Sequence, residues 1–494
     1  MYKQLLQTLL PVVGGLLFAL LFAGEIWGVN ALIFTLFLLL TLALGRAPRT
    51  WSFEGRITAV SSLFLAAMVV LHNTGFAKFC LAGCLLLTVG TVHHERVRFL
   101  VFGLLLAARS TLIAPLQWVR EAFSTGPSGA RLFQWRTLQL SVLPLVLFGC
   151  FYGLYAAANA QFARLSGRFW TGLFDWFGGM FNGIESLYFL LGLLVTSAAL
   201  YRSDWPLLRR WAARMSELLP RRSTAVRSSP HLHSPIALRR ECDSGVILFT
   251  LVNALLLLVN ITDLVYVWGP QETMTAYQTK QYVHEGTYLL IASILLAAAI
   301  VLYFFRGSLN FYQRNRTLKR LTYGWIAQNA VLTLSVAARN YHYISEFGLA
   351  FKRIGVFVFL LSTLTGLFWL YRKVRLRRSA YYLWHRNTWS VFFILVLTAT
   401  VGWTSVITHY NLSLLAIQRT DWDFLIRELP LRNAYALETA LVETVEYPDK
   451  ARLLQRIENK QVAFERAQAG RTWLSWNWAD ASVRRSRTAP PHVE

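Results

Sequence analysis

The sequence predicts an all-α, polytopic helical membrane protein with about 11 transmembrane helices and a small helical C-terminal tail outside the cytoplasm. Charged residues make up 15% of its 494 residues, whereas a soluble chain carries about 25%. Hydrophobic residues make up 55%, and the mean hydropathy is +0.41. Apolar runs close to the bilayer-crossing length of about 20 residues follow one another as far as residue 409.

The predicted spans are the apolar runs that reach this length. They cover residues 6–24, 28–45, 57–74, 76–93, 138–158, 184–201, 245–268, 285–305, 323–344, 353–372 and 388–409. The first run is longer than the apolar region of a signal peptide, and Glu25-Ile26-Trp27 offers no small-x-small cleavage site. We therefore interpret it as an uncleaved first helix.

The basic residues predict the orientation of these spans. With the N-terminus in the cytoplasm, the cytoplasmic side receives 30 of the Lys and Arg residues before residue 410, and the other side receives seven. The acidic residues divide seven to seven, so the asymmetry lies in the cations, as the positive-inside rule requires. The C-terminus is then extracytoplasmic.

Residues 99–117 are apolar enough to suggest a twelfth span. Arg109 and Pro115 interrupt the run, and a span here would place every later Arg-rich loop outside. We therefore expect an interfacial or re-entrant helix at this position.

The chain divides into six parts by composition. These are a four-helix membrane segment (1–94), a cytoplasmic or interfacial segment (95–137), a two-helix membrane segment (138–201), a basic cytoplasmic loop (202–244), a five-helix membrane segment with a polar cluster (245–409) and an extracytoplasmic helical tail (410–494).

The tail differs in kind from the rest, since it holds 12 basic and 11 acidic residues after Tyr410. Pro430, Pro448 and Gly470 mark helix boundaries within it. Three tryptophans lie within six residues: Trp473, Trp476 and Trp478. They either pack the tail onto the outer membrane–water interface or form a small core of its own.

Several kinds of chemistry are not supported by the sequence. The pI of 10.3 arises from cations in loops between apolar runs, so we expect no nucleic-acid partner. Cys80 and Cys84 lie in an apolar run, and the pair His231 and His233 lacks a third ligand nearby, so we predict no metal site. No Gly-rich phosphate loop or familiar hydrolase motif occurs, and we predict no catalytic residue and no cofactor.

Polar residues inside the predicted spans gather in helices seven to nine. The candidate residues, which form either a polar site or a structural cluster, are Asp263, Arg339, Asn260, Asn340, His284, Glu285, Tyr343, Lys352 and Arg353. In one interpretation they form a site that opens to the outside and takes a substrate, ion or lipid headgroup. In the other they satisfy one another and fix helix packing.

Within this cluster the sequence predicts an ion pair between Asp263 and Arg339. Each residue lies five positions inside the outer end of its helix, which is about 7.5 Å at the α-helical rise. Equal depth and opposite charge make pairing the least costly way to keep both groups ionised. We expect Asn260 to bind the remaining carboxylate lone pair and Asn340 to assist beside the guanidinium.

Several runs resemble a bacterial membrane family, domain of unknown function 4173, which is related to domain of unknown function 4153. They are Asp263-x-x-Tyr266-x-Trp268, Tyr282-Val-His284-Glu285-Gly286, Leu302-Tyr-Phe-Phe305, the stretch from Arg339-Asn340 to Arg353-Ile354-Gly355-Val356, Tyr410-Asn411 and Ser475-Trp476-Asn477. The resemblance covers most of residues 135–480. It implies a bacterial inner-membrane protein and brings no activity with it.

Three classes of function remain. We favour a non-enzymatic regulator or complex subunit, whose partners are the lipid bilayer and a membrane or periplasmic protein bound through the tail. The alternatives are a secondary transporter using helices seven to nine, or a membrane enzyme that acts on a lipid-linked substrate through Asp263, His284 or Glu285.

Overall fold

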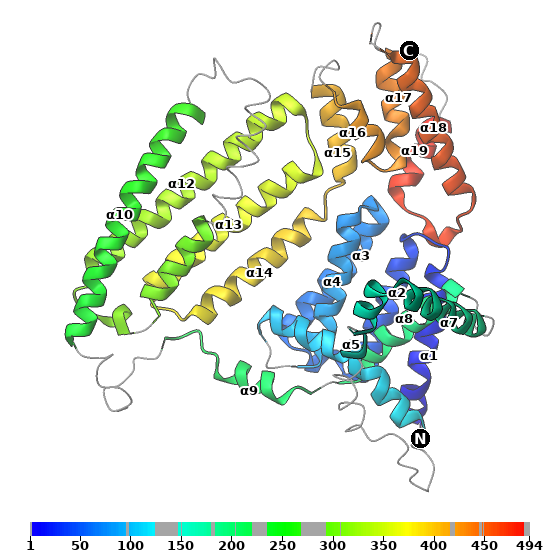
Figure 1. Cartoon of the computed structure of the whole chain (residues 1–494), viewed down its shortest axis with the longest axis horizontal. Coiled ribbons are helices and arrows are strands. Elements are labelled where there is room, and N and C mark those ends of the chain that lie inside the picture. Colours follow the sequence, from blue (N-terminus) through cyan, green and yellow to red (C-terminus); the bar gives the residue numbers. More distant parts are fainter. Residues whose placement is uncertain are drawn as a thin grey trace.

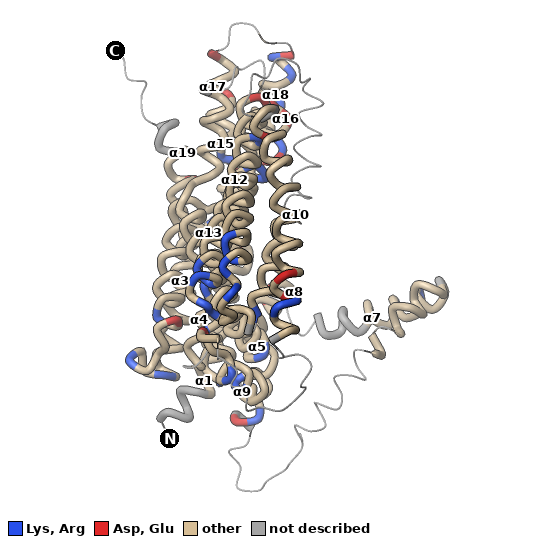
Figure 2. Tube along the Cα trace, turned by 90° about the vertical axis from the view of Figure 1, so that its left-hand side faces the viewer, with Lys and Arg blue, Asp and Glu red and all other residues tan. Residues whose placement is uncertain are grey.

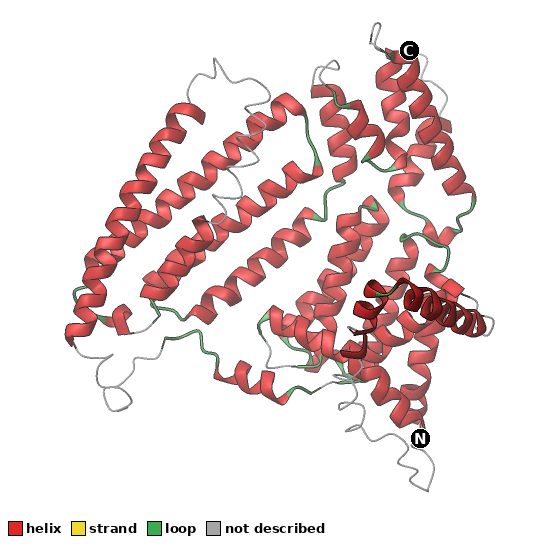
Figure 3. Ribbon diagram, viewed as in Figure 1, coloured by secondary structure: helices red, strands yellow, loops and turns green. Residues whose placement is uncertain are grey.

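The computed structural model confirms the all-α fold (Figure 3). Its described residues form helices and loops, with one isolated β-bridge between Leu218 and Arg378. The described residues are 2–94, 98–123, 147–149, 151–178, 183–202, 204–219, 235–267, 293–306, 308–414, 420–443, 447 and 449–488.

A first bundle comes from the N-terminal part of the chain (Figure 1). Its helices are α1 (Tyr2–Phe22), α2 (Val29–Gly45), α3 (Phe53–His72), α4 (Gly75–Val92), α5 (Leu100–Phe123) and α8 (Gly183–Leu200), with the short η1 (Pro48–Thr50). The side chains of Ser52 and Thr74 cap α3 and α4 by accepting backbone hydrogen bonds. Gly14 and Gly192 let α1 and α8 approach so closely that a Cβ at either position would collide with the other helix.

A second bundle follows it (Figure 1). It contains α10 (Pro235–Val267), a helix at Ser293–Phe304, η3 (Ser308–Phe311), α12 (Arg316–Phe347), α13 (Phe351–Arg375), α14 (Ala380–Thr398) and α15 (Trp403–His409), which continues into η4 (Tyr410–Leu414). Its apolar core centres on Phe249, Phe305 and Leu318, which are fully buried. Side chains of α14, including Phe392, also enter the core of the first bundle, so α14 joins the two.

Length and composition identify this chain as a multi-pass membrane protein. Six described helices are long and apolar enough to cross a membrane: α3, α4, α5, α8, α10 and α13. A seventh is added if α14 and the following helix, bent by 60° between them, count as one span. Shorter apolar helices lie at Thr8–Phe22, Val29–Gly45, Leu147–Ala158 and Ser293–Phe304. Helix α12 is long but carries polar side chains along much of its length. The total of about 11 spans stays a prediction.

The apolar segment around residues 99–117 forms the continuous helix α5, with Pro115 inside it. Near its start, Gly103 packs against Gly90, close to the end of α4. Near its other end, Trp118 Nε1 donates a 2.9 Å hydrogen bond to the carbonyl of Thr8 in the first turns of α1. Both ends of α5 therefore contact the end of the bundle where α1 begins, and the helix lies across it (Figure 1). Although α5 is long enough to cross a membrane, this placement favours the interfacial assignment, which stays a prediction.

The C-terminal residues form a compact helical unit, as predicted. We call residues 420–443, 447 and 449–488 the C-terminal cap. It contains α16 (Trp422–Arg427), η6 (Leu431–Asn433), α17 (Ala434–Glu443), α18 (Lys450–Ala469), η7 (Trp473–Ser475) and α19 (Trp478–Thr488). Leu425, Leu437 and Ile457 are buried in its core together with Ile354 of α13 and Ile407 of α15.

The tryptophans do not form this core. Trp473, Trp476 and Trp478 are 68%, 44% and 44% exposed, so the interpretation of these indoles as the core of the tail is wrong. Leu and Ile side chains from α16, α17 and α18 fill that space instead.

Two further helices lie outside the bundles. The short α9 (Pro206–Arg214) runs between their lower ends (Figure 1), and α7 (Ala160–Gly178) stands out to one side (Figure 2). Figure 2 also shows that many of the Lys and Arg residues lie in the half of the molecule where the chain begins.

Candidate functional site

The predicted ion pair between Asp263 and Arg339 is present. The guanidinium Nη2 of Arg339 contacts Asp263 Oδ1, and the two side chains are 10% and 3% exposed. Among the described residues, the second carboxylate oxygen of Asp263, Oδ2, has no hydrogen-bond partner. The pair thus joins α10 to α12 near the C-terminal ends of both helices. This end of the second bundle lies away from the end of the molecule where α1 begins (Figure 1).

Below the pair, polar side chains connect the same two helices at regular intervals. Asn253 Nδ2 donates to the carbonyl of Leu321 (3.0 Å), and Gln328 Nε2 donates to Asn253 Oδ1 (2.7 Å). One further step along, Asn260 Nδ2 donates to the carbonyl of Gln328 (3.2 Å). The expectation that Asn260 binds the Asp263 carboxylate is therefore wrong, because its amide is directed at the backbone of α12. These contacts fix the packing of α10 on α12.

Asn340 and Arg353 fasten the turn between α12 and α13. Asn340 Nδ2 donates to the carbonyl of Arg353 (3.0 Å), so the expectation that it assists the Arg339 guanidinium is wrong. Arg353 Nη1 donates to the carbonyls of Phe347 (2.8 Å) and Gly348 at the end of α12, and its guanidinium lies 4.4 Å from the ring centre of Tyr343. Lys352 is exposed. The stretch from Arg339 to Arg353 thus encodes a structural clamp.

Asn411 completes this clamp and was not among the predicted residues. Its side chain accepts a hydrogen bond from Leu349 N (2.6 Å) and donates one to Leu349 O (2.9 Å). Gly348 has a φ of +82°, and a Cβ there would meet the Asn411 side chain. The only signal for Asn411 in the sequence is its membership of the Tyr410-Asn411 run.

The remaining candidates and the described cavities do not add a catalytic arrangement. His284 and Glu285 lie outside the described residues. The described residues contain no group of His, Cys, Asp and Glu that could hold a metal ion. A cleft of about 750 Å³ lies between Leu147–Ala158 and α7, and another of about 250 Å³ lies between helices of the first bundle. Both are lined chiefly by apolar and aromatic side chains, and neither includes Asp263 or Arg339.

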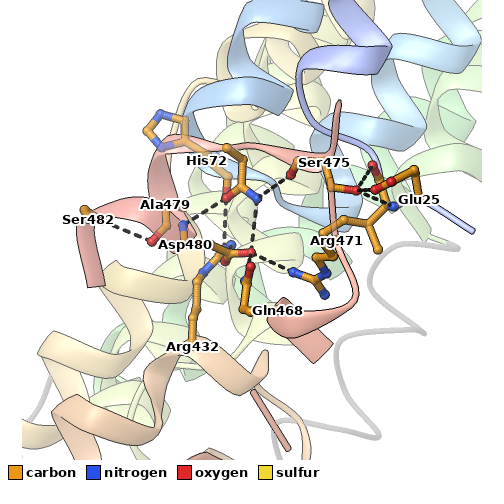
Figure 4. A network of polar contacts seen from close by, with 11 residues as sticks. Glu25, His72, Arg432, Gln468, Arg471, Ser475, Ala479, Asp480 and Ser482 are labelled. Atoms are coloured by element: carbon orange, nitrogen blue, oxygen red, sulfur yellow. Dashed lines mark hydrogen bonds and ion pairs between the residues drawn. The ribbon is translucent and has the colours of Figure 1, made fainter. Parts of the chain in front are cut away.

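A second polar network, which the sequence did not predict, lies where the C-terminal cap meets the membrane helices (Figure 4). We call it the Asp480 seam. Asp480 Oδ2 accepts hydrogen bonds from Gln468 Nε2 (2.9 Å), Asn477 Nδ2 (3.1 Å) and Arg471 Nη1 (3.2 Å). Asp480 Oδ1 lies 3.4 Å from Arg432 Nη1. The carboxylate therefore gathers side chains from four places in the cap.

Arg432 extends the seam to both membrane bundles. Its Nη2 donates to the carbonyl of His72 at the end of α3 (2.9 Å) and to Thr404 Oγ1 in α15 (3.5 Å). Arg432 is buried, which lowers its pKa from the ordinary value, and the neighbouring Asp480 carboxylate opposes that shift. One guanidinium thus links the cap, the first bundle and the second bundle.

The loop between α1 and α2 supplies the other half of the seam. Ser475 Oγ donates to a carboxylate oxygen of Glu25, and Thr472 N donates to the other (3.2 Å). Ile26 N donates to Ser475 Oγ (2.9 Å), and Val29 N donates to the carbonyl of Trp476 (3.0 Å). Burial raises the pKa of Glu25, but the hydrogen bonds from Ser475 and Thr472 outweigh it, so that the pKa lies below its ordinary value.

These features define an all-α polytopic membrane protein with a docked helical cap and without a recognisable catalytic centre in its described residues. Residues 58–440 match the family described as Domain of unknown function (DUF4153). The chain belongs to this family, the relative of the one that its sequence runs resemble. No curated protein and no solved structure matches the chain.

Proposed function

We propose that this chain is a non-enzymatic membrane module, a regulator or complex subunit, which binds a membrane or periplasmic protein through its C-terminal cap. The observation that carries the proposal is the Asp480 seam. It fastens a folded, charge-balanced unit to both membrane bundles through buried hydrogen bonds. A rigidly held unit loses little conformational freedom when a partner binds, which favours affinity.

The exposed tryptophans give this unit a contact surface. Trp476 is held by its backbone contact with Val29, while its indole and those of Trp473 and Trp478 are accessible. Tryptophan is enriched among residues that dominate protein–protein binding energy. Indoles next to the ends of membrane helices also favour the bilayer interface, so the lipid bilayer is a partner of the same surface.

The polar cluster supports a scaffolding role in preference to turnover. Asn253, Asn260 and Gln328 use their side-chain amides to join α10 to α12. The amide of Asn340 and the guanidinium of Arg353 fasten the next turn. Polar groups that are engaged in hydrogen bonds between helices stabilise helix packing.

The orientation that we propose places the N-terminus in the cytoplasm of a bacterium and the cap outside the inner membrane. The 30-to-seven division of basic residues supports it, as do the positions of the start of α1 and of the C-terminal cap at opposite ends of the molecule (Figure 1). Reporters fused after Glu494 and within the 202–244 loop should read extracytoplasmic and cytoplasmic respectively. Reporters that read on the same side would contradict this topology.

Site-specific crosslinking tests the function. A photoreactive amino acid placed at Trp473 in cells should yield a discrete protein adduct. The same probe at Val442, which is exposed on α17, serves as the control. If positions 473, 476 and 478 all gave only lipid adducts, the tryptophans would serve the membrane interface alone and the partner proposal would fail.

A secondary transporter remains the second candidate because Asp263 Oδ2 has no partner among the described residues. An Asp263→Asn variant that folds distinguishes the two functions. Loss of solute flux in proteoliposomes with crosslinking retained at position 473 would favour transport.

A further inference from the structure

The short helix α9 has three distinct faces. Leu208 is buried against Phe102 and Leu106 of α5. Leu207 and Trp211 lie on the adjoining flank and are 61% and 59% exposed. Three arginines cover the rest of the helix: at about 100° per residue, Arg210 and Arg214 adjoin the Leu207 side of the apolar flank, and Arg209 lies on the far side of Leu208. A short helix with an exposed apolar flank beside a basic face is typical of a segment that lies in a membrane–water interface.

Contacts made by the residues before and after α9 fix the position of this helix relative to α5 and α14. On one side, the guanidinium of Arg109 in α5 lies 5.3 Å from the ring centre of Trp205. On the other, the carbonyl of Glu217 accepts a hydrogen bond from Ser379 N (3.1 Å), at the start of α14, and its carboxylate lies 3.0 Å from His385 Nδ1. Helix α8 ends at Leu200 and α14 begins at Ala380, so α9 lies at the ends of candidate spans.

The arginines of α9 differ in their partners. Arg209 Nη1 lies 3.1 Å from Asp204 Oδ2. Arg210 and Arg214 are exposed, and within the described part of the chain neither forms an ion pair with an acidic side chain. Two accessible cations next to an apolar flank complement the negative phosphate and apolar tails of a lipid.

We propose that α9 is a binding site for the headgroups of anionic phospholipids. Leu207 and Trp211 enter the interfacial region of the bilayer, and Arg210 and Arg214 contact the lipid phosphate. The fixed position of α9 between α5 and α14 presents both features to the same leaflet.

Lipid retention by the purified full-length chain tests this site. Native mass spectrometry in a zwitterionic detergent measures retained phosphatidylglycerol and phosphatidylcholine over a lipid titration. Replacing both arginines (R210Q with R214Q) should weaken phosphatidylglycerol retention about 30-fold, and each single change about fivefold, because one cation near an anionic membrane surface contributes a factor of this size. Trp211→Ala should weaken retention of both lipids.

The control removes the same charge elsewhere. R452Q with R466Q, two exposed positions on α18, should leave phosphatidylglycerol retention unchanged. Equal loss in the control, unchanged retention in the single and double α9 variants, or unchanged retention in Trp211→Ala would overturn the proposal. Full competition by millimolar inorganic phosphate would identify a soluble-anion site and overturn it too, whereas weak competition and loss of binding at high salt support a lipid headgroup.

Discussion

Replacing Asp480 by Asn should release the C-terminal cap from the first membrane bundle. The change removes the negative charge that pairs directly with both Arg432 and Arg471. It also replaces one carboxylate oxygen by an NH₂ group. If this group takes the place of Oδ2, it faces the donors of Gln468 and Asn477. If it takes the place of Oδ1, it faces Arg432. In either orientation, N–H donors face the new NH₂ donor beside the buried guanidinium of Arg432.

The magnitude follows from burial. Arg432 and Asp480 have side chains that are 8% and 12% exposed, so water screens them little. Removing one partner of such a buried pair costs about 3 kcal/mol. At 1.4 kcal/mol per tenfold change, this raises the undocked population about 150-fold. Hydrogen exchange at the amides of Ile26 and Val29, which bind the cap, should accelerate by about that factor.

Asp423→Asn is the matched control. Asp423 contacts Arg456 (2.6 Å) in the same cap, but its side chain is exposed, and the exchange of Ile26 and Val29 should not change. If Asp480→Asn left exchange at these amides as slow as in the unaltered chain, the Asp480 seam would not be what docks the cap.

Three further predictions concern individual charged groups. Asp263→Asn and Arg339→Gln should each destabilise the chain by up to about 3 kcal/mol in thermal unfolding. The charge exchange that combines Asp263→Arg with Arg339→Asp should partly restore folding. A double variant that is no more stable than either single variant would contradict a direct pair. Because the pKa of Glu25 is lowered from 4.5, its contribution to cap docking is complete above pH 4.5 and is lost as pH falls through the lowered pKa, and Glu25→Gln should remove this acid sensitivity in hydrogen exchange. Burial lowers the pKa of Lys460 from 10.5 to about 8, so the folded cap binds fewer protons than the unfolded one between these values; stability should rise with pH across that window, and a Lys460→Met variant should show no such rise.

The helices and the ion pair could be predicted because both depend on short-range regularities. Apolar runs of bilayer length specify spans wherever they occur. Asp263 and Arg339 could be matched because their depths follow from the rise per residue along two helices of the same direction. To predict this ion pair it was enough that α10 and α12 are neighbours, and the details of their packing were not needed.

The partners of individual amides could not be predicted in this way. Asn260 and Asn340 lie near the ion pair in sequence, but helix rotation directs their amides to the carbonyls of Gln328 and Arg353. A helical periodicity places a residue on a face and does not specify which neighbour that face meets.

The Asp480 seam was beyond prediction for a different reason. Glu25 and Ser475 are 450 residues apart, and no periodic pattern links a loop after the first helix to the end of the chain. The run Ser475-Trp476-Asn477 was recognisable as a motif, but its role in docking the cap emerges only from the fold.

The most direct test of the proposed function combines docking with partner contact. Crosslinking from position 473 in cells should give a protein adduct in the otherwise unaltered chain, and Asp480→Asn should reduce its yield strongly while Asp423→Asn leaves it unchanged. An adduct of equal yield in Asp480→Asn, in a chain whose exchange at Ile26 and Val29 shows the cap undocked, would contradict the claim that the docked cap is the partner-binding surface.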